Sequence, residues 1–222
     1  MSIFKFLVNH NKQGSFVNQF RQKRFDYLKN RIEKLIQKDT FKILDIGGDI
    51  QYWKNIGWQH PACKIHLLNL YTSEIPQSDT SQFTSSIGDG LALAYQKGDV
   101  DLIFSNSVIE HVGSHENQQI FANEVMRVSD KYIIQTPSLW FPLEPHSLWP
   151  LFQFLPHPIR ALLIMTFNIN YFPKAKTYKA AIVVSHSTLM FTHKRFKQLF
   201  PDAEIQVERF WGIPKSYTAI KL

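Results

Sequence analysis

The stretch 42–53, KILDIGGDIQYW, holds the residues whose types and spacing point most directly to chemistry. A short apolar run is followed by Asp45 and then by the paired glycines Gly47 and Gly48. Glycine has no Cβ, so the backbone of such a turn can approach a ligand closely. A carboxylate there can accept hydrogen bonds from a ribose or an amino group. We expect a nucleotide-type pocket; the alternative is a tight strand-to-helix turn that binds nothing.

Polar residues also stand where three later strands are expected to end. Asn69 ends the second, Asp89 follows the third between Gly88 and Gly90, and Ser105 ends the fourth. Taken singly, each could be a loop cap or an Asx-turn. The carboxyl ends of parallel strands meet at one edge of a sheet, however, and ligands bind there. The set therefore favours a nucleoside pocket.

Two histidines and one acid are candidates for proton transfer. His111 follows the fourth strand and is the first candidate base; the alternative is a histidine that only packs or caps a helix start. His146 is the second, because a nearby Glu144 can orient its ring and raise its basicity; the alternative is a structural turn. A metal set of Glu144, His146 and His157 matches no established spacing, so no metal is expected.

The elements that must position these residues alternate along the chain. Apolar runs predict strands at 41–46, 64–70, 82–87, 101–105 and 131–135, and two closing strands at 203–210 and 216–221. Helical spacing predicts helices at 15–38, just after Asp49, at 91–96, at 114–128 and at 192–200, with Ser15, Ser114 and Thr192 as N-caps. This order predicts an α/β fold with a doubly wound, seven-stranded, mostly parallel sheet and a terminal antiparallel hairpin.

Residues 137–175 interrupt that alternation with seven prolines and many aromatic side chains. Insertions in such folds sit at the carboxyl ends of the strands, where ligands bind. We expect the segment to form a lid or an acceptor pocket. A peripheral contact with a membrane would use the same aromatic residues. A subdomain with its own core is a further alternative.

The length of 222 residues and the hydrophobic content of 44% suit one domain, 1–222, which begins with a basic helical segment at 1–40. The single cysteine, Cys63, excludes an internal disulfide and is expected to be a core thiol, so a cytoplasmic setting is the simplest fit. The apolar start is too short for a secretory signal, and the longest apolar run, 161–167, is far short of the roughly 18 residues of a membrane span.

The net charge of +7 is unevenly spread, because residues 1–40 and 174–222 are basic and residues 41–173 are acidic. An acidic centre suits a cationic cofactor. Basic flanks suit an anionic substrate, a membrane surface or a nucleic acid, although scattered lysines are often only a solvated surface. The oligomeric state stays open.

Several motifs together resemble class I S-adenosylmethionine-dependent methyltransferases. They are ILDIGG at 43–48, GDG at 88–90, DVDLIFSNSVIEHV at 99–112 and RVSDKYIIQTPS at 127–138. The FPLEPH stretch at 141–146 is similar to a motif of bacterial small-molecule methyltransferases. The resemblance implies a Rossmann-like fold and S-adenosyl-L-methionine as cofactor.

The resemblance also implies roles for single residues. The cofactor-binding set would be Asp45, Gly47, Gly48, Asn69, Asp89, Gly90 and Ser105. In that set the glycine turn lines the methionine and ribose parts, Asp89 bonds the adenine amino group, and Ser105 lies under the methionine part. Asn69 stands where many members have an acid. Asp49 and Gln51 stand where glycines are expected, and Asp49 could face the cofactor's ammonium group.

The resulting hypothesis is methyl transfer to an oxygen or nitrogen of a small-molecule acceptor, hydrophobic or anionic, with His111, His146 and Glu144 as the catalytic candidates. A nucleotide-dependent oxidoreductase is one alternative, although the first turn lacks G-x-G-x-x-G. A non-catalytic cofactor-binding module is another, given Asn69 and the missing glycines. A nucleic-acid methyltransferase is disfavoured, because no N/D-P-P-Y motif stands at 105–108.

Overall fold

The computed structural model describes residues 16–222, with side chains from residue 22 onward. The chain divides into two compact units. Unit 1 contains the described residues up to Phe104, together with Arg127–Tyr132 and Leu222. Unit 2 contains Ser105–Met126 and Ile133–Lys221. The expected cap Ser15 lies outside the described residues, and a single domain over 1–222 stays a prediction.

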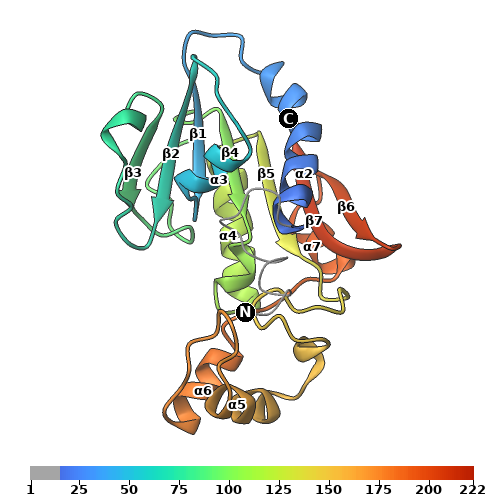
Figure 1. Cartoon of the computed structure of the whole chain (residues 1–222). Helices are drawn as coiled ribbons and strands as arrows, with labels where there is room; N and C mark the ends of the chain where they lie inside the picture. Colours follow the sequence, from blue (N-terminus) through green and yellow to red (C-terminus); the bar gives the residue numbers. More distant parts are fainter. Residues whose placement is uncertain (1–15) are drawn as a thin grey trace. The chain divides into compact units, whose positions relative to one another are not determined.

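The strands confirm the predicted fold class. They are β1 (Phe41–Ile46), β2 (Cys63–Asn69), β3 (Phe83–Ile87), β4 (Leu102–Asn106), β5 (Tyr132–Pro137), β6 (Glu204–Phe210) and β7 (Ile213–Lys221) (Figure 1). They form a seven-stranded sheet in the order β3-β2-β1-β4-β5-β7-β6. β1 pairs in parallel with β2 and β4, and β2 with β3, whereas β6 and β7 are antiparallel.

The helices are α2 (Phe16–Glu33), α3 (Ile50–Asn55), α4 (His115–Val128), α5 (His157–Thr166), α6 (Tyr178–Ser185) and α7 (His193–Leu199). α2 ends at Glu33 and not at residue 38 as the sequence pattern predicted. Beyond it the backbone tightens, because Leu35 N donates to Ile32 O and Ile36 N donates to Glu33 O. These shorter-range bonds close the helix in 3₁₀-like turns.

The helix expected at 91–96 is absent, and the segment is irregular. Its carbonyls are satisfied from outside, because the Arg127 guanidinium donates to Leu93 O at 2.9 Å and to Tyr95 O at 2.8 Å. Only Leu93 of this apolar run is buried. The run therefore lacks the continuous apolar face that stabilises a short helix.

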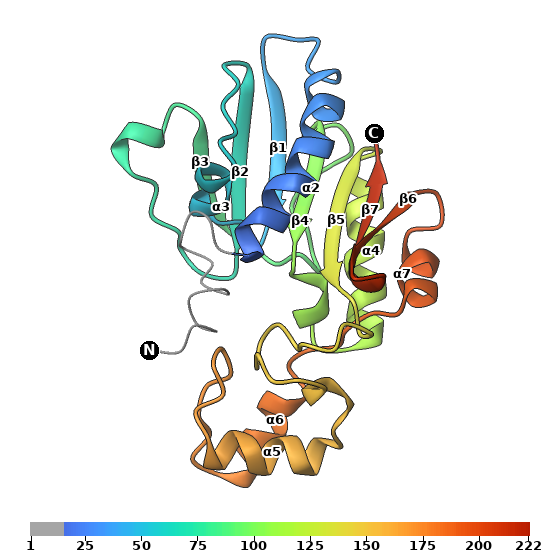
Figure 2. The same ribbon diagram turned by 45° about the vertical axis from the view of Figure 1, so that its right-hand side comes forward.

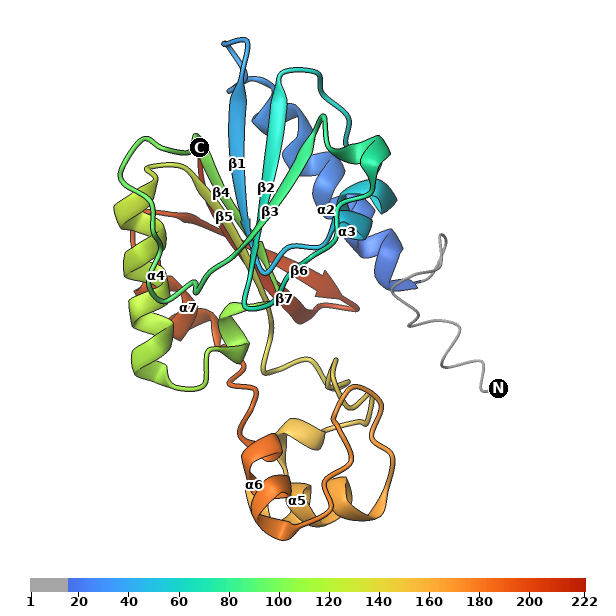
Figure 3. The same cartoon turned by 90° about the vertical axis from the view of Figure 1, so that its left-hand side faces the viewer.

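Aromatic side chains hold the helices of unit 1 against its strands. Figure 3 shows α2 and α3 on the same face of β1 and β2. Phe25 of α2 meets Trp53 and Trp58 edge-on, at centroid distances of 6.3 and 5.4 Å. Trp53 packs on Phe104 of β4 at 5.0 Å, and all four rings are buried. This packing fixes α3, and with it the turn between β1 and α3.

In unit 2 the hairpin β6–β7 packs with α7 (Figure 2). The register shifts between Glu208 and Arg209, which marks a β-bulge or irregularity. The hairpin turns at Trp211 and Gly212, which both have positive φ. Because this turn is tight, β7 begins at Ile213, earlier than the predicted residue 216.

The proline-rich segment has a small core of its own, as one alternative expected, and this core extends past residue 175 into α6. Its buried members are Phe152, Ala161, Ile164, Ile169, Ala175 and Ala181. α5 and α6 lie side by side and carry exposed apolar side chains such as Leu162 and Val183. Among the helices of residues 16–222, none combines the length and the apolar character needed to cross a bilayer. A lid function for this segment stays a prediction.

Candidate functional site

The glycine turn after β1 requires both of its glycines, for different reasons. Gly47 has a φ of 72°, a conformation that glycine adopts without steric cost. A Cβ added at Gly48 would lie 2.1 Å from Asp45 Oδ2. The backbone at Gly48 therefore lies directly against the Asp45 carboxyl group.

Asp45 supports this turn from inside unit 1. Its side chain is buried, and Trp53 Nε1 donates a 2.7 Å hydrogen bond to Asp45 Oδ2. Burial raises the pKa of Asp45 to about 8, and Asp49 adds to the rise, although the Trp53 bond partly offsets it. The sequence suggested a residue that contacts the cofactor; that role stays a prediction.

Asn69 links the glycine turn to the next loop. Its Nδ2 donates to Gly48 O at 2.9 Å and to Ser73 Oγ at 3.2 Å. The backbone carbonyl of Asn69 accepts a 2.8 Å hydrogen bond from Gly88 N. An aspartate could not donate the bond to Gly48 O, because an ionised carboxylate only accepts. The hydrogen bond to Gly48 O therefore gives a structural reason for an amide at position 69, where the family resemblance suggested an acid.

Asp89 and Asp49 each shape a local turn. Asp89 Oδ1 accepts from Leu91 N at 2.9 Å, an Asx-turn that contains Gly90. Asp49 is the N-cap of α3, and its Oδ1 accepts from Gln51 N at 2.9 Å. Asp49 has extended backbone angles, φ −131° and ψ 130°, which need no glycine. The backbone at position 49 therefore does not require the glycine that was expected there.

Large apolar side chains are exposed beside this turn. Leu70 and Tyr71 follow Asn69 directly and are 74% and 70% exposed. Ile87 precedes Gly88 and is 66% exposed. Such exposed side chains around a glycine turn can stack on a flat apolar ligand. The remaining predicted cofactor residue, Ser105, is fully buried in β4.

In unit 2, a strained turn leads from β4 to the short 3₁₀ helix η2 (Ile109–His111). Ser107 has a φ of 60°. It is held there because Ser107 N donates to Gln135 O at 3.0 Å and Ser107 Oγ to Gln135 Oε1 at 2.9 Å. Strained positions with this much support cluster at functional sites.

Glu110 is the residue of this turn that the sequence reasoning missed. Its side chain is fully buried, and Thr136 Oγ1 donates a 2.9 Å bond to Glu110 Oε2. The other oxygen, Oε1, has no hydrogen-bond partner. Burial raises the pKa of Glu110 to about 7, although hydrogen bonds and the charge of His146 oppose the rise. An acid directly before His111 in the sequence was the available signal.

The three predicted catalytic residues form one chain of contacts within unit 2. Glu144 Oε1 lies 2.6 Å from His146 Nδ1, and His146 Nε2 lies 3.0 Å from His111 Nε2. On the far side, His111 Nδ1 lies 3.3 Å from Ser187 O. The sequence predicted the pair of Glu144 and His146, and the structure adds their contact with His111.

Burial and neighbouring charges move the pKa values of these groups apart. Burial and the nearby His146 lower the pKa of His111 to about 4. Burial lowers the pKa of His146 as well. The hydrogen bond with Glu144 and the negative charges of Glu144 and Glu110 raise it by more, so the net shift of the His146 pKa is upward. Burial would raise the pKa of Glu144, yet bonds from His146 and Ser147 lower it.

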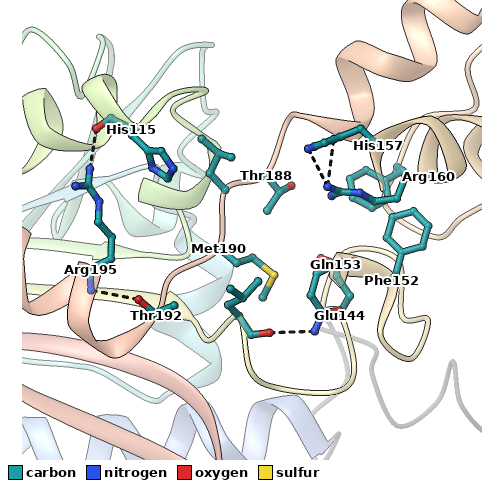
Figure 4. A pocket seen from close by; sticks show the side chains of 13 residues that line it. His115, Glu144, Phe152, Gln153, His157, Arg160, Thr188, Met190, Thr192 and Arg195 are labelled. Carbon is teal, nitrogen blue, oxygen red and sulfur yellow. Dashed lines mark hydrogen bonds between the residues drawn. The ribbon is translucent and has the colours of Figure 1, made fainter. Parts of the chain in front are cut away.

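A cavity of about 410 Å³ lies within unit 2 (Figure 4). Glu144 is the one acidic residue of its wall, which otherwise consists of basic, uncharged polar and apolar residues. Arg195 Nη2 donates to His115 O at 3.0 Å, and Arg160 Nη2 lies 3.1 Å from both ring nitrogens of His157. Four wall residues carry a buried polar atom without a hydrogen-bond partner, namely Gln153 Oε1, Arg160 Nε, Thr188 Oγ1 and Arg195 Nε.

No family model and no curated protein match this chain. Solved structures do match it, and the three described next are each 10% identical to it. The CurJ carbon methyltransferase aligns with a TM-score of 0.58 over 96% of this chain and 57% of its own. Magnesium protoporphyrin IX methyltransferase from Synechocystis PCC 6803, with bound SAH, has a TM-score of 0.53 over 97% and 91%. Phosphoethanolamine N-methyltransferase 2 from Haemonchus contortus, in complex with S-adenosyl-L-methionine, has a TM-score of 0.51 over 100% and 60%.

These likenesses show the Rossmann-like fold of class I methyltransferases. This chain spans less than two thirds of the length of two of these three proteins. The three proteins are a carbon methyltransferase, a magnesium protoporphyrin IX methyltransferase and a phosphoethanolamine N-methyltransferase. The fold is thereby established, and activity and substrate are questions for the site itself.

Proposed function

We propose that this chain is an S-adenosylmethionine-dependent methyltransferase that acts on an oxygen or nitrogen of a small anionic acceptor. The observation that carries the proposal is the ordered glycine turn of unit 1. Asn69 bonds Gly48 on one side and Gly88 on the other, so both loops are held before a ligand arrives. Two of the structures with the same fold are described with SAH or S-adenosyl-L-methionine bound.

The groups around the turn suit a nucleoside with a charged amino acid attached. Backbone at Gly47 and Gly48 can approach the methionine part, Asp89 can accept from the adenine amino group, and Asn69 can bond a ribose hydroxyl. Exposed Leu70 and Ile87 offer apolar surface for adenine. Each of these roles is part of the proposal.

We assign the acceptor to the cavity of unit 2. Arg160 and Arg195 contribute positive charge to its wall, and Gln153 and Thr188 contribute buried polar atoms without partners. A buried polar atom without a partner costs about 1–3 kcal/mol, so a ligand that supplies the missing bonds gains that amount. A carboxylate or phosphate on the acceptor could accept hydrogen bonds from Arg160, Arg195 and Thr188, and a hydroxyl or amino group on it could donate to Gln153 Oε1.

The chemistry needed from the protein is mainly positioning. S-adenosylmethionine supplies a methyl group on a positively charged sulfur. The acceptor's lone pair forms the new bond to carbon, and the S–CH3 electron pair returns to sulfur, which becomes neutral. Alignment of the two reactants can contribute about 7–11 kcal/mol. A hydroxyl acceptor must also lose a proton, and a ring nitrogen of His111 or His146, oriented through Glu144, is the base we assign.

The test of the cofactor site compares two glycines of similar backbone angle in unit 1. Gly47 has φ 72° and Gly57 has φ 67°, and a Cβ at Gly57 would meet nothing within 4 Å. We expect Gly47→Val to abolish S-adenosylmethionine binding measured by calorimetry. Gly57→Val carries a similar backbone strain away from the turn, and we expect it to keep the affinity within about threefold.

The same titration includes NADH and NADPH as ligands of the rival oxidoreductase. Binding of a nicotinamide cofactor in place of S-adenosylmethionine would overturn the proposal. Unchanged S-adenosylmethionine affinity in Gly47→Val would remove the glycine turn as the site.

A further inference from the structure

Within unit 2, His111 and His146 face each other through the same kind of nitrogen. Their Nε2 atoms are 3.0 Å apart, and their rings are nearly perpendicular, at 88°. Each Nδ1 faces an oxygen acceptor, which is Ser187 O for His111 and Glu144 Oε1 for His146. A neutral imidazole carries one proton, and these acceptors draw it to Nδ1. If both rings are neutral, the two Nε2 lone pairs point toward each other, which is unfavourable unless a shared proton or a metal cation lies between them.

Glu110 adds a third donor atom to this place. A carboxylate oxygen of Glu110 and a nitrogen of each histidine all lie within 4.8 Å of one another. Glu110 is fully buried, its Oε2 is bonded by Thr136, and its Oε1 has no hydrogen-bond partner. Within residues 22–222 no Lys or Arg pairs with it. A buried carboxylate with an unsatisfied oxygen is costly unless a proton or a cation compensates it.

We propose that Glu110, His111 and His146 bind a divalent transition-metal ion such as Zn²⁺ or Mn²⁺. The donors are two imidazole nitrogens and one carboxylate oxygen, a mixture that suits Zn²⁺, Mn²⁺ and Fe²⁺ better than the all-oxygen sites of Mg²⁺ or Ca²⁺. Zinc–nitrogen and zinc–oxygen bonds of about 2.0–2.2 Å place tetrahedral ligands roughly 3.3–3.6 Å apart. The three donors are within a small side-chain adjustment of that spacing.

The surrounding hydrogen bonds are those that metal ligands need. Metal-bound histidines usually donate their other ring nitrogen to a carboxylate or a carbonyl, which fixes the tautomer. Glu144 has this role for His146, and Ser187 O has it for His111. Thr136 orients Glu110 in the same way. The sequence spacing of Glu144, His146 and His157 fits poorly with a set of metal ligands. In the proposed site, Glu144 does not bind the metal but holds the ligand His146.

Three protein ligands leave one tetrahedral position open, as in catalytic zinc sites. If the proposed methyl transfer is correct, an acceptor hydroxyl could bind there and lose its proton to water more easily, because the ion lowers its pKa. His111 and His146 would then act as ligands and not as bases. Metal binding itself does not depend on the methyl transfer.

The test uses the full chain after chelator treatment, titrated with Zn²⁺, Mn²⁺ and Mg²⁺ by calorimetry. We expect one Zn²⁺ per chain and much weaker Mg²⁺ binding. Glu110→Gln, His111→Ala and His146→Ala should each weaken Zn²⁺ binding by at least about a hundredfold. Glu144→Gln should weaken it by about 10–100-fold, as expected of an outer partner. His157→Ala is the matched histidine control and should keep the wild-type affinity.

Further measurements distinguish loss of the metal site from misfolding of a variant and from an error in the proposed function. Circular dichroism checks each variant's fold, and Co²⁺ absorption in the wild type reports tetrahedral coordination. S-adenosylmethionine affinity, measured on the same samples, separates failure of the cofactor site from failure of the metal site. If Zn²⁺ binds no more tightly to the wild type than to folded His111→Ala and Glu110→Gln, the metal site is wrong, and a proton shared by the two histidines explains their contact.

Discussion

Asp45 shows how one buried carboxyl group can control the glycine turn. It accepts the Trp53 hydrogen bond and lies so close to Gly48 that any side chain there would collide with it. Burial raises its pKa from 3.8 to about 8. Between these two values the folded chain keeps the proton that the unfolded chain releases. The stability of the fold should therefore depend on pH through this residue.

The sign of that dependence follows from the raised pKa. As pH rises from about 4 to 8, Asp45 reduces stability by up to roughly 1.4 kcal/mol per pH unit, and the loss levels off above 8. The Asp45→Asn variant does not lose stability in this way, because asparagine does not titrate. We expect its advantage over the wild type in urea unfolding to grow from pH 5 to pH 8. The exposed Asp130→Asn variant is the control, and a pH-independent difference for Asp45→Asn would contradict the prediction.

At this scale the sequence predicted the candidates His111, Glu144 and His146 and the pairing of Glu144 with His146, but not the contact between the two histidines. The distance between His111 and His146 depends on two loops that follow different strands, 35 positions apart. Glu110 was missed because a buried acid beside a histidine has no periodic signal. The roles of the residues in the glycine turn are implied by the family resemblance and stay predictions, and their hydrogen bonds could not be predicted from sequence.

Among the elements, α3 is the one that most directly shapes the glycine turn. It is a helix of 6 residues, too short to be stable by itself, so its start depends on the Asp49 cap and on Trp53 packing. The family resemblance suggested Asp49 as a partner of the cofactor's ammonium group. The structure shows the cap, and the role toward the cofactor stays a prediction.

We expect Asp49→Ala to lower the free energy of unfolding by about 1 kcal/mol, because Gln51 N loses its acceptor. Asp49→Ser keeps a capping oxygen and should restore most of the loss. Chemical denaturation measures both variants. If Asp49→Ser restores stability but not S-adenosylmethionine affinity, the carboxylate also contacts the cofactor, and a purely structural role is excluded.

Strands β1, β4 and β5 could be predicted because each is a short apolar run that becomes buried. The helix at 91–96 could not be excluded from sequence, because its carbonyl partner Arg127 is far away in the chain. The end of α2 and the start of β7 also depend on backbone bonds that residue type does not reveal. Local pattern thus predicts elements better than their ends.

For the whole molecule, the two candidate sites belong to different compact units. The glycine turn is in unit 1, and the basic cavity and the histidine pair are in unit 2. Side-chain changes in the cavity should therefore alter acceptor binding without altering cofactor affinity. This separation makes the two halves of the proposed function testable one at a time.

Arg195 is the cavity residue chosen for this test. With inorganic phosphate as the anionic probe, we expect the wild type to gain thermal stability with increasing phosphate. Arg195→Gln should need about tenfold more phosphate for the same shift, because a charge-assisted hydrogen bond is lost. Its S-adenosylmethionine affinity should match the wild type. Arg209→Gln, on β6, is the control, and an equal loss in that variant would show only a general charge effect.

The two bonds that Asn69 makes with neighbouring loops also have a kinetic consequence. Gly48 and Gly88 are already fixed by one residue, so little chain has to become ordered when a cofactor enters. Association should then occur in a single fast phase, with a rate constant that rises linearly with cofactor concentration and no slow rearrangement. In Asn69→Asp, which cannot donate to Gly48, a slower second phase should appear in stopped-flow traces, even where the equilibrium affinity changes little.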